Sequence, residues 1–313
     1  MPKLVVTMPA FNAESTIGLA VKSTLRAMPR DSELLVLDDK STDATLEVLS
    51  TISDPRLRIL VAEENVGGPA SRRRLLTESD SEFVASIDAD DVSFPWRFSM
   101  QQRALDHADI VFSSAVRFGS VKASKATTAA RFAQALRVRP SATVALRPSE
   151  LPSALLFHNP VWHPSLFARR RTIEEAGGYN VSRHGDDWDL WLRIAISGAR
   201  MYRMAIPVIG YRESPKQASR SPAKAAAIRN NRVLRSSYVD LFNALVQTVS
   251  LNVDSRPLDK VAETVRIGLR EQLALFRQIN RLHYSSIIQQ NRIHFVLSLF
   301  PDGEPEESGT TSR

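Results

Sequence analysis

The sequence predicts an α/β protein in which a doubly wound, mostly parallel sheet is flanked by helices and followed by a C-terminal helical extension. Three observations predict this class. Strand-like and helix-like segments alternate through the first third of the chain, as they do in parallel sheets. Residues 34–37 form a continuous run of Leu and Val, which is typical of a strand buried on both faces. From about residue 223 to residue 300 the pattern is mainly helical, with one apolar face.

The elements follow one another in a regular order. Short apolar segments rich in Val, Leu, Ile and Phe are expected to be strands. They are residues 4–8, 34–37, 57–61, 83–87 and 111–118. Helical spacing of apolar residues separates them, and we expect helices to begin at Asn12, at Ser41, at Pro69 and near Pro95. Right-handed crossovers through these helices make the strands parallel.

The remainder of the chain is expected to divide by composition. Residues 119–150 are rich in Ala, Ser, Thr and Arg, and we interpret them as an insertion or a mobile loop. Residues 151–213 return to mixed structure. The expected organisation is an α/β domain at 1–213, with halves at 1–118 and 151–213, a basic helical extension at 214–300, and a disordered acidic tail at 301–313.

The composition excludes several classes of protein. A hydrophobic content of 43% argues against wholesale disorder. The absence of cysteine excludes a disulfide scaffold, thiolate metal sites and a cysteine nucleophile. No Gly-x-Gly-x-x-Gly follows the first expected strand and no P-loop motif occurs, which argues against dinucleotide oxidoreductases and P-loop NTPases. Because we recognise no signal peptide and no long apolar run, we expect a cytoplasmic protein, or one peripheral at the inner face of a membrane.

Two acidic clusters follow expected strands directly. They are Asp38-Asp39, after residues 34–37, and Asp88-Ala89-Asp90-Asp91, after residues 83–87. Ligands of parallel sheets bind outside the carboxyl ends of the strands, so both clusters are expected at one edge. Closely spaced carboxylates suit Mg²⁺ or Mn²⁺ with a diphosphate, and an acid past a strand end can accept hydrogen bonds from a nucleotide. The alternative is that these acids only cap the helices that follow.

Other residues are candidates for binding or catalysis. Arg72 follows an Asn65-x-Gly67 turn and could face an anionic ligand or only solvate a helix. Asp186 and Asp187 begin an expected helix, whose dipole keeps an acid ionised and able to act as a general base toward a hydroxyl. Trp188 and Trp191 could stack on a sugar or pack in the core. His163 could be a ligand or a hydrogen-bonded structural residue.

Taken together, these motifs resemble glycosyltransferase family 2, which has the GT-A fold. The resemblance covers about residues 3–213. Its motifs are Pro9-Ala10-Phe11-Asn12-x-Glu14, Asp38-Asp39-Lys40-Ser41-Thr42-Asp43, Asn65-x-Gly67 with Arg72, Ile87-Asp88-Ala89-Asp90-Asp91 with Pro95, His163-Pro164-Ser165, Gly177-Gly178-Tyr179, Asp186 to Arg193, and Tyr211-Arg212. The chain departs from the family pattern at Lys40, where the family has Gly, at Arg73, where it usually has Asn, and at Asp186, where it often has Glu.

The resemblance implies a metal-dependent inverting glycosyltransferase that uses a nucleotide-diphosphate sugar. It implies that Asp187 is the general base and that Asp90 binds Mn²⁺ or Mg²⁺. The implied donor-binding residues are Pro9, Phe11, Asn12, Glu14, Asp38, Asp39, Asn65, Arg72, Asp88 and Ala89. The implied acceptor-side residues are Asp186, Trp188 and His163.

Two other functions are alternatives for a chain with these residues. A catalytically inactive nucleotide-sugar-binding or scaffold protein is the main alternative, although the retained Asp88, Asp90 and Asp187 favour an enzyme. A sugar nucleotidyltransferase is disfavoured, because residues 10–14 stand where a Gly-rich basic loop is expected. The acceptor could be a glycan, a lipid-linked glycan or a protein.

The net charge of +7 lies mainly in residues 216–300, which hold 13 Lys or Arg residues against 5 Asp or Glu residues. This segment is expected to bind an anionic surface, either a membrane or a lipid-diphosphate acceptor. The alternative is an extension that packs or forms a homo-oligomer and has a solvated basic face. Nucleic acid is not an expected partner, because no nucleic-acid motif accompanies the charge.

Overall fold

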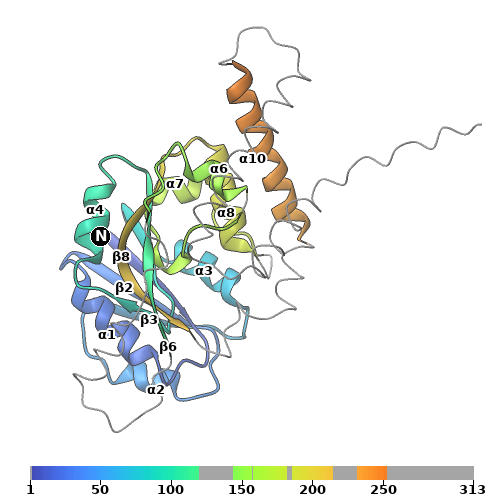
Figure 1. Cartoon of the computed structure of the whole chain (residues 1–313). Helices are drawn as coiled ribbons and strands as arrows, with labels where there is room; N and C mark the ends of the chain where they lie inside the picture. Colours follow the sequence, from blue (N-terminus) through green and yellow to red (C-terminus); the bar gives the residue numbers. More distant parts are fainter. Residues whose placement is uncertain (1, 120–143, 157, 182–184, 214–230, 252–313) are drawn as a thin grey trace, which may run out of the picture. The chain divides into compact units, whose positions relative to one another are not determined.

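The computed structural model describes residues 2–119, 144–156, 158–181, 185–213 and 231–251 (Figure 1). The chain divides into two compact units, one made of residues 1–155 and 159–241 and the other of residues 156–158 and 242–313. The sheet and the candidate site belong to the first unit. The predicted domain boundary near residue 213 borders residues 214–230, which lie outside the described ranges, and it stays a prediction.

Within the described residues, eight strands form one sheet in the order β3-β2-β1-β4-β7-β6-β8-β5. Their bounds are β1 Leu4–Ala10, β2 Ser32–Asp38, β3 Leu57–Val61, β4 Phe83–Ser86, β5 Val92–Ser93, β6 Ile110–Gly119, β7 Phe167–Arg169 and β8 Met201–Glu213. Strands β1 to β4 pair in parallel, and so do β6 and β8. Because β7 is antiparallel to both β4 and β6, the strands β6 and β8 run in the same direction as β1 to β4. The predicted mostly parallel sheet is therefore confirmed.

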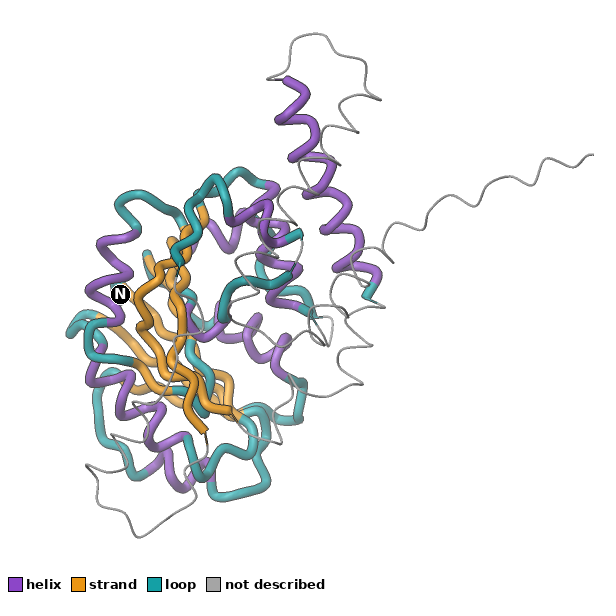
Figure 2. Tube along the Cα trace, in the orientation of Figure 1, coloured by secondary structure: helices purple, strands orange, loops and turns teal. Residues whose placement is uncertain are grey.

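Helices cover both faces of this sheet (Figure 2). Their bounds are α1 Ile17–Ala27, α2 Thr45–Ser50, α3 Gly68–Thr77, α4 Arg97–Ala104, α6 Leu151–Leu155, α7 Arg170–Glu175, α8 Asp186–Ile196 and α10 Arg232–Leu251, with a 3₁₀ turn η1 at His163–Ser165. Val6 of β1 shares a core with Ile17 of α1, whereas its neighbour Val5 shares a second core with Leu75 of α3. Alternate residues of one strand thus bury on opposite faces, which is why the strands read as continuous apolar runs.

Two predicted helix starts are wrong, and both errors have the same cause. Helix α1 begins at Ile17 and not at Asn12, and α2 begins at Thr45 and not at Ser41. The side chain of Asn12 accepts a hydrogen bond from the backbone N–H of Thr42, and that of Ser41 accepts one from the backbone N–H of Asn12. Each polar side chain therefore links two loops instead of capping the helix that follows.

Parts of the predicted insertion and extension lie outside the described residues, namely 120–143, 214–230 and everything after residue 251, including the acidic tail. The end of the insertion is part of the fold, because Leu146 and Arg203 of β8 exchange two backbone hydrogen bonds of 2.9 and 3.0 Å. Helix α10 is the described part of the predicted helical extension. Among the helices that the structure describes, none has the length and apolar character needed to span a membrane.

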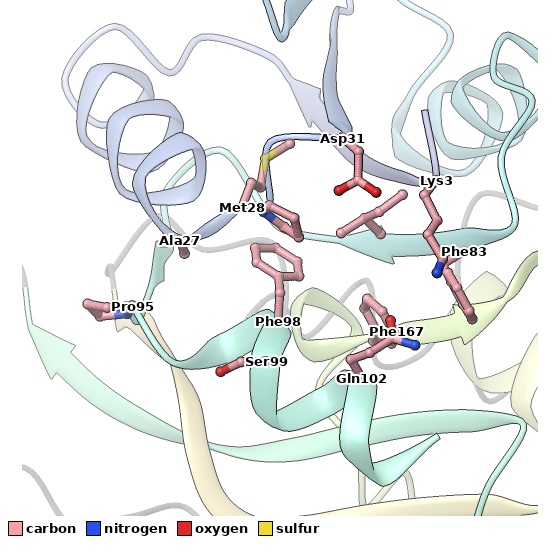
Figure 3. A pocket seen from close by; sticks show the side chains of 12 residues that line it. Lys3, Ala27, Met28, Asp31, Phe83, Pro95, Phe98, Ser99, Gln102 and Phe167 are labelled. Carbon is pink, nitrogen blue, oxygen red and sulfur yellow. The ribbon is translucent and has the colours of Figure 1, made fainter. Parts of the chain in front are cut away.

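A cavity of about 320 Å³ lies at the amino ends of β1 and β4. Figure 3 shows Met28, Phe98 and Phe167 around it, with Lys3 and Asp31 at its margin. Its lining is mostly apolar, and it lies at the end of the sheet opposite the two acidic clusters. The candidate site is therefore assigned to the carboxyl edge and not to this cavity.

Candidate functional site

The carboxyl edge of the sheet brings together side chains that are far apart in the sequence. Hydrogen bonds and ion pairs join several of them. The joined pairs are Asp39 with Gly67, Arg72 with Asp88, Arg72 with Asp186, Asp90 with Arg212, and Asn159 with Asp187. Predicted site residues from the first and second halves of the chain thus share one edge, where ligands of parallel sheets bind.

The loops after β1 and β2 are held together by hydrogen bonds, which we name the loop brace. It joins the Thr42 N–H to Asn12 Oδ1 (2.8 Å), the Ala13 N–H to Thr45 Oγ1 (2.8 Å), the Glu14 N–H to Asp43 Oδ2 (3.1 Å), and the Ala44 N–H to Glu14 Oε2 (3.0 Å). Asn12 adopts a left-handed φ of 48°, which Asn tolerates better than most residues. Asn12 and Glu14 therefore shape the edge, and their predicted contact with a donor stays a prediction.

The two acids at the end of β2 are buried and already hydrogen-bonded. Asp38 accepts bonds from the backbone N–H and the hydroxyl of Ser41. Asp39 is 3% exposed, and its two carboxylate oxygens accept the N–H groups of Val66 (2.9 Å) and Gly67 (2.8 Å). A carboxylate can accept about four hydrogen bonds, so Asp39 keeps acceptor capacity for a ligand.

The turns beside these acids require unusual backbone conformations. Gly67 has a φ of 83°, in a region that favours glycine. Lys40 has a left-handed φ of 63°, which gives a physical reason for the glycine that the family pattern has at this position. Asn65 donates from its side chain to the Asp39 carbonyl at 3.0 Å. The predicted donor-side residues Asp39 and Asn65 are therefore part of one rigid turn.

Asp88, Asp90 and Asp91 form the cluster after β4, with one ligand atom of each lying within 4.8 Å of the others. Burial, and then the charge of Asp88, raise the pKa of Asp90 to about 6. Burial and the two neighbouring carboxylates raise the pKa of Asp91 well above its usual range. One oxygen of Asp91 accepts the Arg212 N–H at 2.8 Å, whereas the other is buried without a hydrogen-bond partner. Hard oxygen atoms with excess negative charge and an orphaned acceptor fit a divalent cation such as Mg²⁺ or Mn²⁺.

Arg72 connects this cluster to the start of α8. Its Nη1 lies 2.9 Å from Asp186 Oδ2, and its Nη2 lies 3.9 Å from Asp88 Oδ1. Burial lowers the pKa of Arg72, but Asp186 and Asp88 more than offset this and keep its pKa above the ordinary value. The Nε–H of Arg72 is buried and has no hydrogen-bond partner. A fixed cation with a spare donor is suited to an anionic ligand, which is one of the two interpretations that the sequence leaves open for Arg72.

The first turn of α8 carries the remaining acids. Asp186 is 6% exposed and is held by Arg72, whereas Asp187 is only partly buried and accepts the Asn159 Nδ2–H at 3.2 Å. Trp188 donates to the Leu155 carbonyl at 3.1 Å, and Trp191 is fully buried. Asp187 is thus more accessible than Asp186. Trp191 packs in the core, which is one of the two roles that the sequence allows for it.

His163 lies below the surface, at 5% exposure. Its Nε2 is 2.9 Å from the Tyr179 hydroxyl and its Nδ1 is 3.3 Å from Ser86 Oγ. Burial, and then the nearby charge of Arg72, lower the pKa of His163 well below its usual value. The imidazole is therefore neutral at pH 7 and has the contacts of a structural histidine.

Replacing His163 with Gln is expected to change how stability depends on pH. An unfolded histidine binds a proton below about pH 6.5, but the folded site disfavours that proton, so the histidine costs stability as the pH falls. The unfolding free energy of His163→Gln minus that of the native protein should be about 1 kcal/mol larger at pH 5.5 than at pH 7.5. Urea unfolding at both pH values measures this shift. His107→Gln, at an exposed histidine, is the matched control, and an equal offset at both pH values would contradict the prediction.

Sequence reasoning missed Arg97, which is fully buried behind the acidic cluster. It donates to the Ser86 carbonyl at 2.6 Å and to Ser93 Oγ at 3.1 Å. Burial lowers the pKa of Arg97 to about 9, and the charge of Asp91 opposes this. Its place two residues after Pro95 was the available signal, but an arginine in a polar segment reads as a surface residue. The contacts of Asn159 with Asp187 were also missed.

Comparison with known proteins gives a family and several relatives. The family model described as "Glycosyl transferase family 2" matches residues 5–174. The chain is 26% identical over 221 residues to the "Putative glycosyltransferase EpsE" of Bacillus subtilis, which covers 68% of this chain and 73% of that protein. It is 34% identical over 96 residues to the "UDP-Glc:alpha-D-GlcNAc-diphosphoundecaprenol beta-1,3-glucosyltransferase WfgD" of Escherichia coli, which covers 31% of this chain and 38% of that protein.

Among solved structures, the chain is similar to S. aureus TarS 1-349 in complex with UDP-GlcNAc. The TM-score is 0.61 at 17% sequence identity, and the match covers 96% of this chain and 82% of that chain. A likeness at this level of identity concerns the fold, and it agrees with the mixed, mostly parallel sheet flanked by helices.

Proposed function

The chain belongs to glycosyl transferase family 2, and we propose that it transfers a sugar from a nucleotide-diphosphate donor to a hydroxyl of a glycan acceptor with inversion at the anomeric carbon. One observation carries this proposal. Arg72 joins the acidic cluster after β4 to the first turn of α8, so that Asp88 and Asp186, which are 98 residues apart, face one edge of the sheet. A donor site and a general base can act on the same sugar only if they are brought together in this way.

The donor is proposed to bind along the ends of β1, β2 and β4. Phe11 is 50% exposed at the end of β1 and offers a flat surface to a base. Asp39 has spare acceptor capacity toward the N–H and O–H donors of a nucleoside, and Arg72 has a spare donor toward the diphosphate. The likeness to TarS, whose structure was solved with UDP-GlcNAc, supports a nucleoside-diphosphate sugar.

The acidic cluster is proposed to hold Mn²⁺ or Mg²⁺, with Asp90 as the ligand and Asp88 and Asp91 beside it. When bound, such a cation neutralises the charge that develops on the departing diphosphate. The chain's own contribution is to fix the carboxylates. Arg212 holds Asp91 through its backbone N–H and the Asp90 carbonyl through its side chain, both at 2.8 Å.

Transfer is proposed to occur in one displacement. Asp187 accepts the proton of the acceptor hydroxyl, while Asn159 orients the carboxylate through its side-chain amide. The acceptor oxygen bonds to the anomeric carbon from the side opposite the diphosphate. The bond from that carbon to the diphosphate oxygen breaks, and its electron pair leaves with the nucleoside diphosphate. The products are an inverted glycoside, the nucleoside diphosphate and protonated Asp187.

A lipid-linked glycan is the proposed acceptor class. The printed name of WfgD describes transfer to a diphosphoundecaprenol-linked sugar, which supports an acceptor of this kind. Such an acceptor would place the chain at a membrane surface, where the basic residues of 216–300 suit anionic headgroups. The cytoplasmic location, the peripheral attachment and a homo-oligomer stay predictions.

The experiment that tests the function is a donor and cation screen. UDP-, GDP-, dTDP- and CMP-sugars are each combined with Mn²⁺, Mg²⁺ or EDTA, and thermal stability and release of the nucleotide are measured. We expect one nucleotide family to stabilise the protein only with a cation, by about 2.7 kcal/mol at about 100 times its Kd. No cation-dependent shift with any donor would contradict the proposed donor site. Retention of configuration in the product would contradict the displacement mechanism.

A further inference from the structure

Two half-buried aromatic rings, of Trp162 and Tyr211, contact each other at the carboxyl edge, and the proposed reaction has not used them. Their centroids are 4.4 Å apart and their planes are tilted by 50°. The guanidinium of Arg117 lies over the Trp162 ring, 5.3 Å from its centroid. Arg117 Nη1 is also 3.5 Å from Glu213 Oε1, and these two side chains are 34% and 33% exposed. We name these four residues the aromatic platform.

The strand register explains why these side chains gather. In the parallel pair β6·β8, Arg117 lies opposite Tyr211 and Gly119 lies opposite Glu213. Residues two apart in a strand face the same side of a sheet, so Arg117, Tyr211 and Glu213 share one face at the carboxyl ends of their strands. Trp162 comes from the segment before η1 and packs onto that face.

The aromatic platform is connected along the chain to both halves of the proposed active site. Tyr211 directly precedes Arg212, whose backbone and side chain bind Asp91 and Asp90. Trp162 follows Asn159, the partner of Asp187, by three residues. The platform is thereby tied by short stretches of chain to the acidic cluster on one side and to the proposed base on the other.

The chemistry of the aromatic platform matches a sugar better than a nucleotide. A pyranose ring has an apolar C–H face, which the negative faces of aromatic rings attract, and hydroxyl groups around its rim. A guanidinium supplies N–H donors and a carboxylate supplies acceptors for those hydroxyls. Arg117 and Glu213 also carry opposite charges and form an ion pair with each other.

We propose, on the basis of the proposed function, that the aromatic platform binds an uncharged pyranose of the acceptor glycan. Trp162 and Tyr211 contact the C–H face of that sugar, and Arg117 and Glu213 bind its hydroxyl groups. The sugar so held lies beside Asp187, which removes the proton from the hydroxyl that reacts. Recognition of the acceptor is thereby separated from recognition of the nucleotide at Asp39.

Saturation-transfer NMR on the full chain tests this inference. The probes are the methyl glycosides of glucose, galactose, mannose and N-acetylglucosamine, with Mg²⁺ and UDP, or the diphosphate that the donor screen selects. We expect saturation of the ring C–H protons of at least one glycoside by the native protein. Trp162→Leu and Tyr211→Leu, which keep an apolar side chain against the core, should each weaken that glycoside's binding by about tenfold.

The controls separate this inference from the proposed function and from loss of fold. Trp96→Leu removes an aromatic ring that is 46% exposed and that donates to the Pro207 carbonyl instead of packing on Trp162 or Tyr211, so it should leave the glycoside signal unchanged. Diphosphate affinity, measured by calorimetry, should stay within about twofold in all variants. Absence of any glycoside signal, or an undiminished signal in the folded Tyr211→Leu and Trp162→Leu proteins, would overturn the inference even where the diphosphate binds. Loss of diphosphate binding in the native protein would instead contradict the proposed function.

Discussion

Replacing Asp187 with Asn should lower kcat for transfer by about 10³-fold while leaving the affinity for the nucleoside diphosphate within about twofold. The amide has nearly the same size and can still accept the hydrogen bond that Asn159 donates, but it cannot take the proton of the acceptor hydroxyl. The effect should therefore appear in kcat and not in donor binding. Initial rates of diphosphate release with acceptor present, together with calorimetric titration of the diphosphate, measure the two quantities separately.

The matched control for Asp187→Asn is Asp80→Asn, which makes the same change at an exposed acid outside the site. It should retain the native rate. If Asp187→Asn kept kcat within about tenfold of the native value, a different group would have to accept the proton. Asp186→Asn would then be the next variant to measure, although its carboxylate is held by Arg72.

Replacing Asp90 with Asn should have two opposite effects. Burial and the neighbouring Asp88 raise the pKa of Asp90 to about 6, so near pH 7.5 its charged form is held at an unfavourable place. The neutral amide removes that repulsion and should raise the Tm of the cation-free protein by about 2–6 °C, because 1 kcal/mol corresponds to about 2–4 °C in a domain of this size. Transfer activity should fall by about 10³-fold, because the proposed cation ligand is lost.

Calorimetric scans in EDTA and in Mn²⁺ measure the first effect of Asp90→Asn. The native protein should gain stability on adding Mn²⁺, whereas the variant should not respond. Asp80→Asn again serves as the control and should respond as the native protein does. A variant that is less stable than the native protein in EDTA, or that keeps its response to Mn²⁺, would contradict the assignment of Asp90.

The first half of the fold could be predicted because its strands are buried on both faces. Residues 34–37 were expected as a strand, and they lie within β2, where all four are fully buried. Two strands were not predicted, β5 in the first half and β7 in the second, because they contain only two and three residues. Such short strands have no periodicity of their own and exist only through pairing with β8, β4 and β6. Local sequence patterns do not record such pairing.

The candidate site was predictable where it depends on the ends of strands. Asp39 and Asp90 follow buried strands, so their common edge followed from topology alone. The bridge from Arg72 to Asp186 spans 114 residues and depends on how α8 packs. The burial of Arg97 and the contact of Trp162 with Tyr211 depend in the same way on long-range packing. Residue spacing gives no signal for the bridge or for the ring contact, and the place of Arg97 two residues after Pro95 does not show that it is buried.

The loop brace has a consequence for attempts to redirect this protein toward another donor. Consider a chimaera in which residues 11–14 come from a relative and residues 41–45 remain those of this protein. The side chains of each loop would then face the backbone of a loop with which they are not matched. Because Asn12 and Glu14 each bond across the brace, the mismatch would disturb both loops beside the proposed nucleotide site at once. The two loops therefore form one structural unit, and a graft intended to alter nucleotide choice should transplant both in a single step.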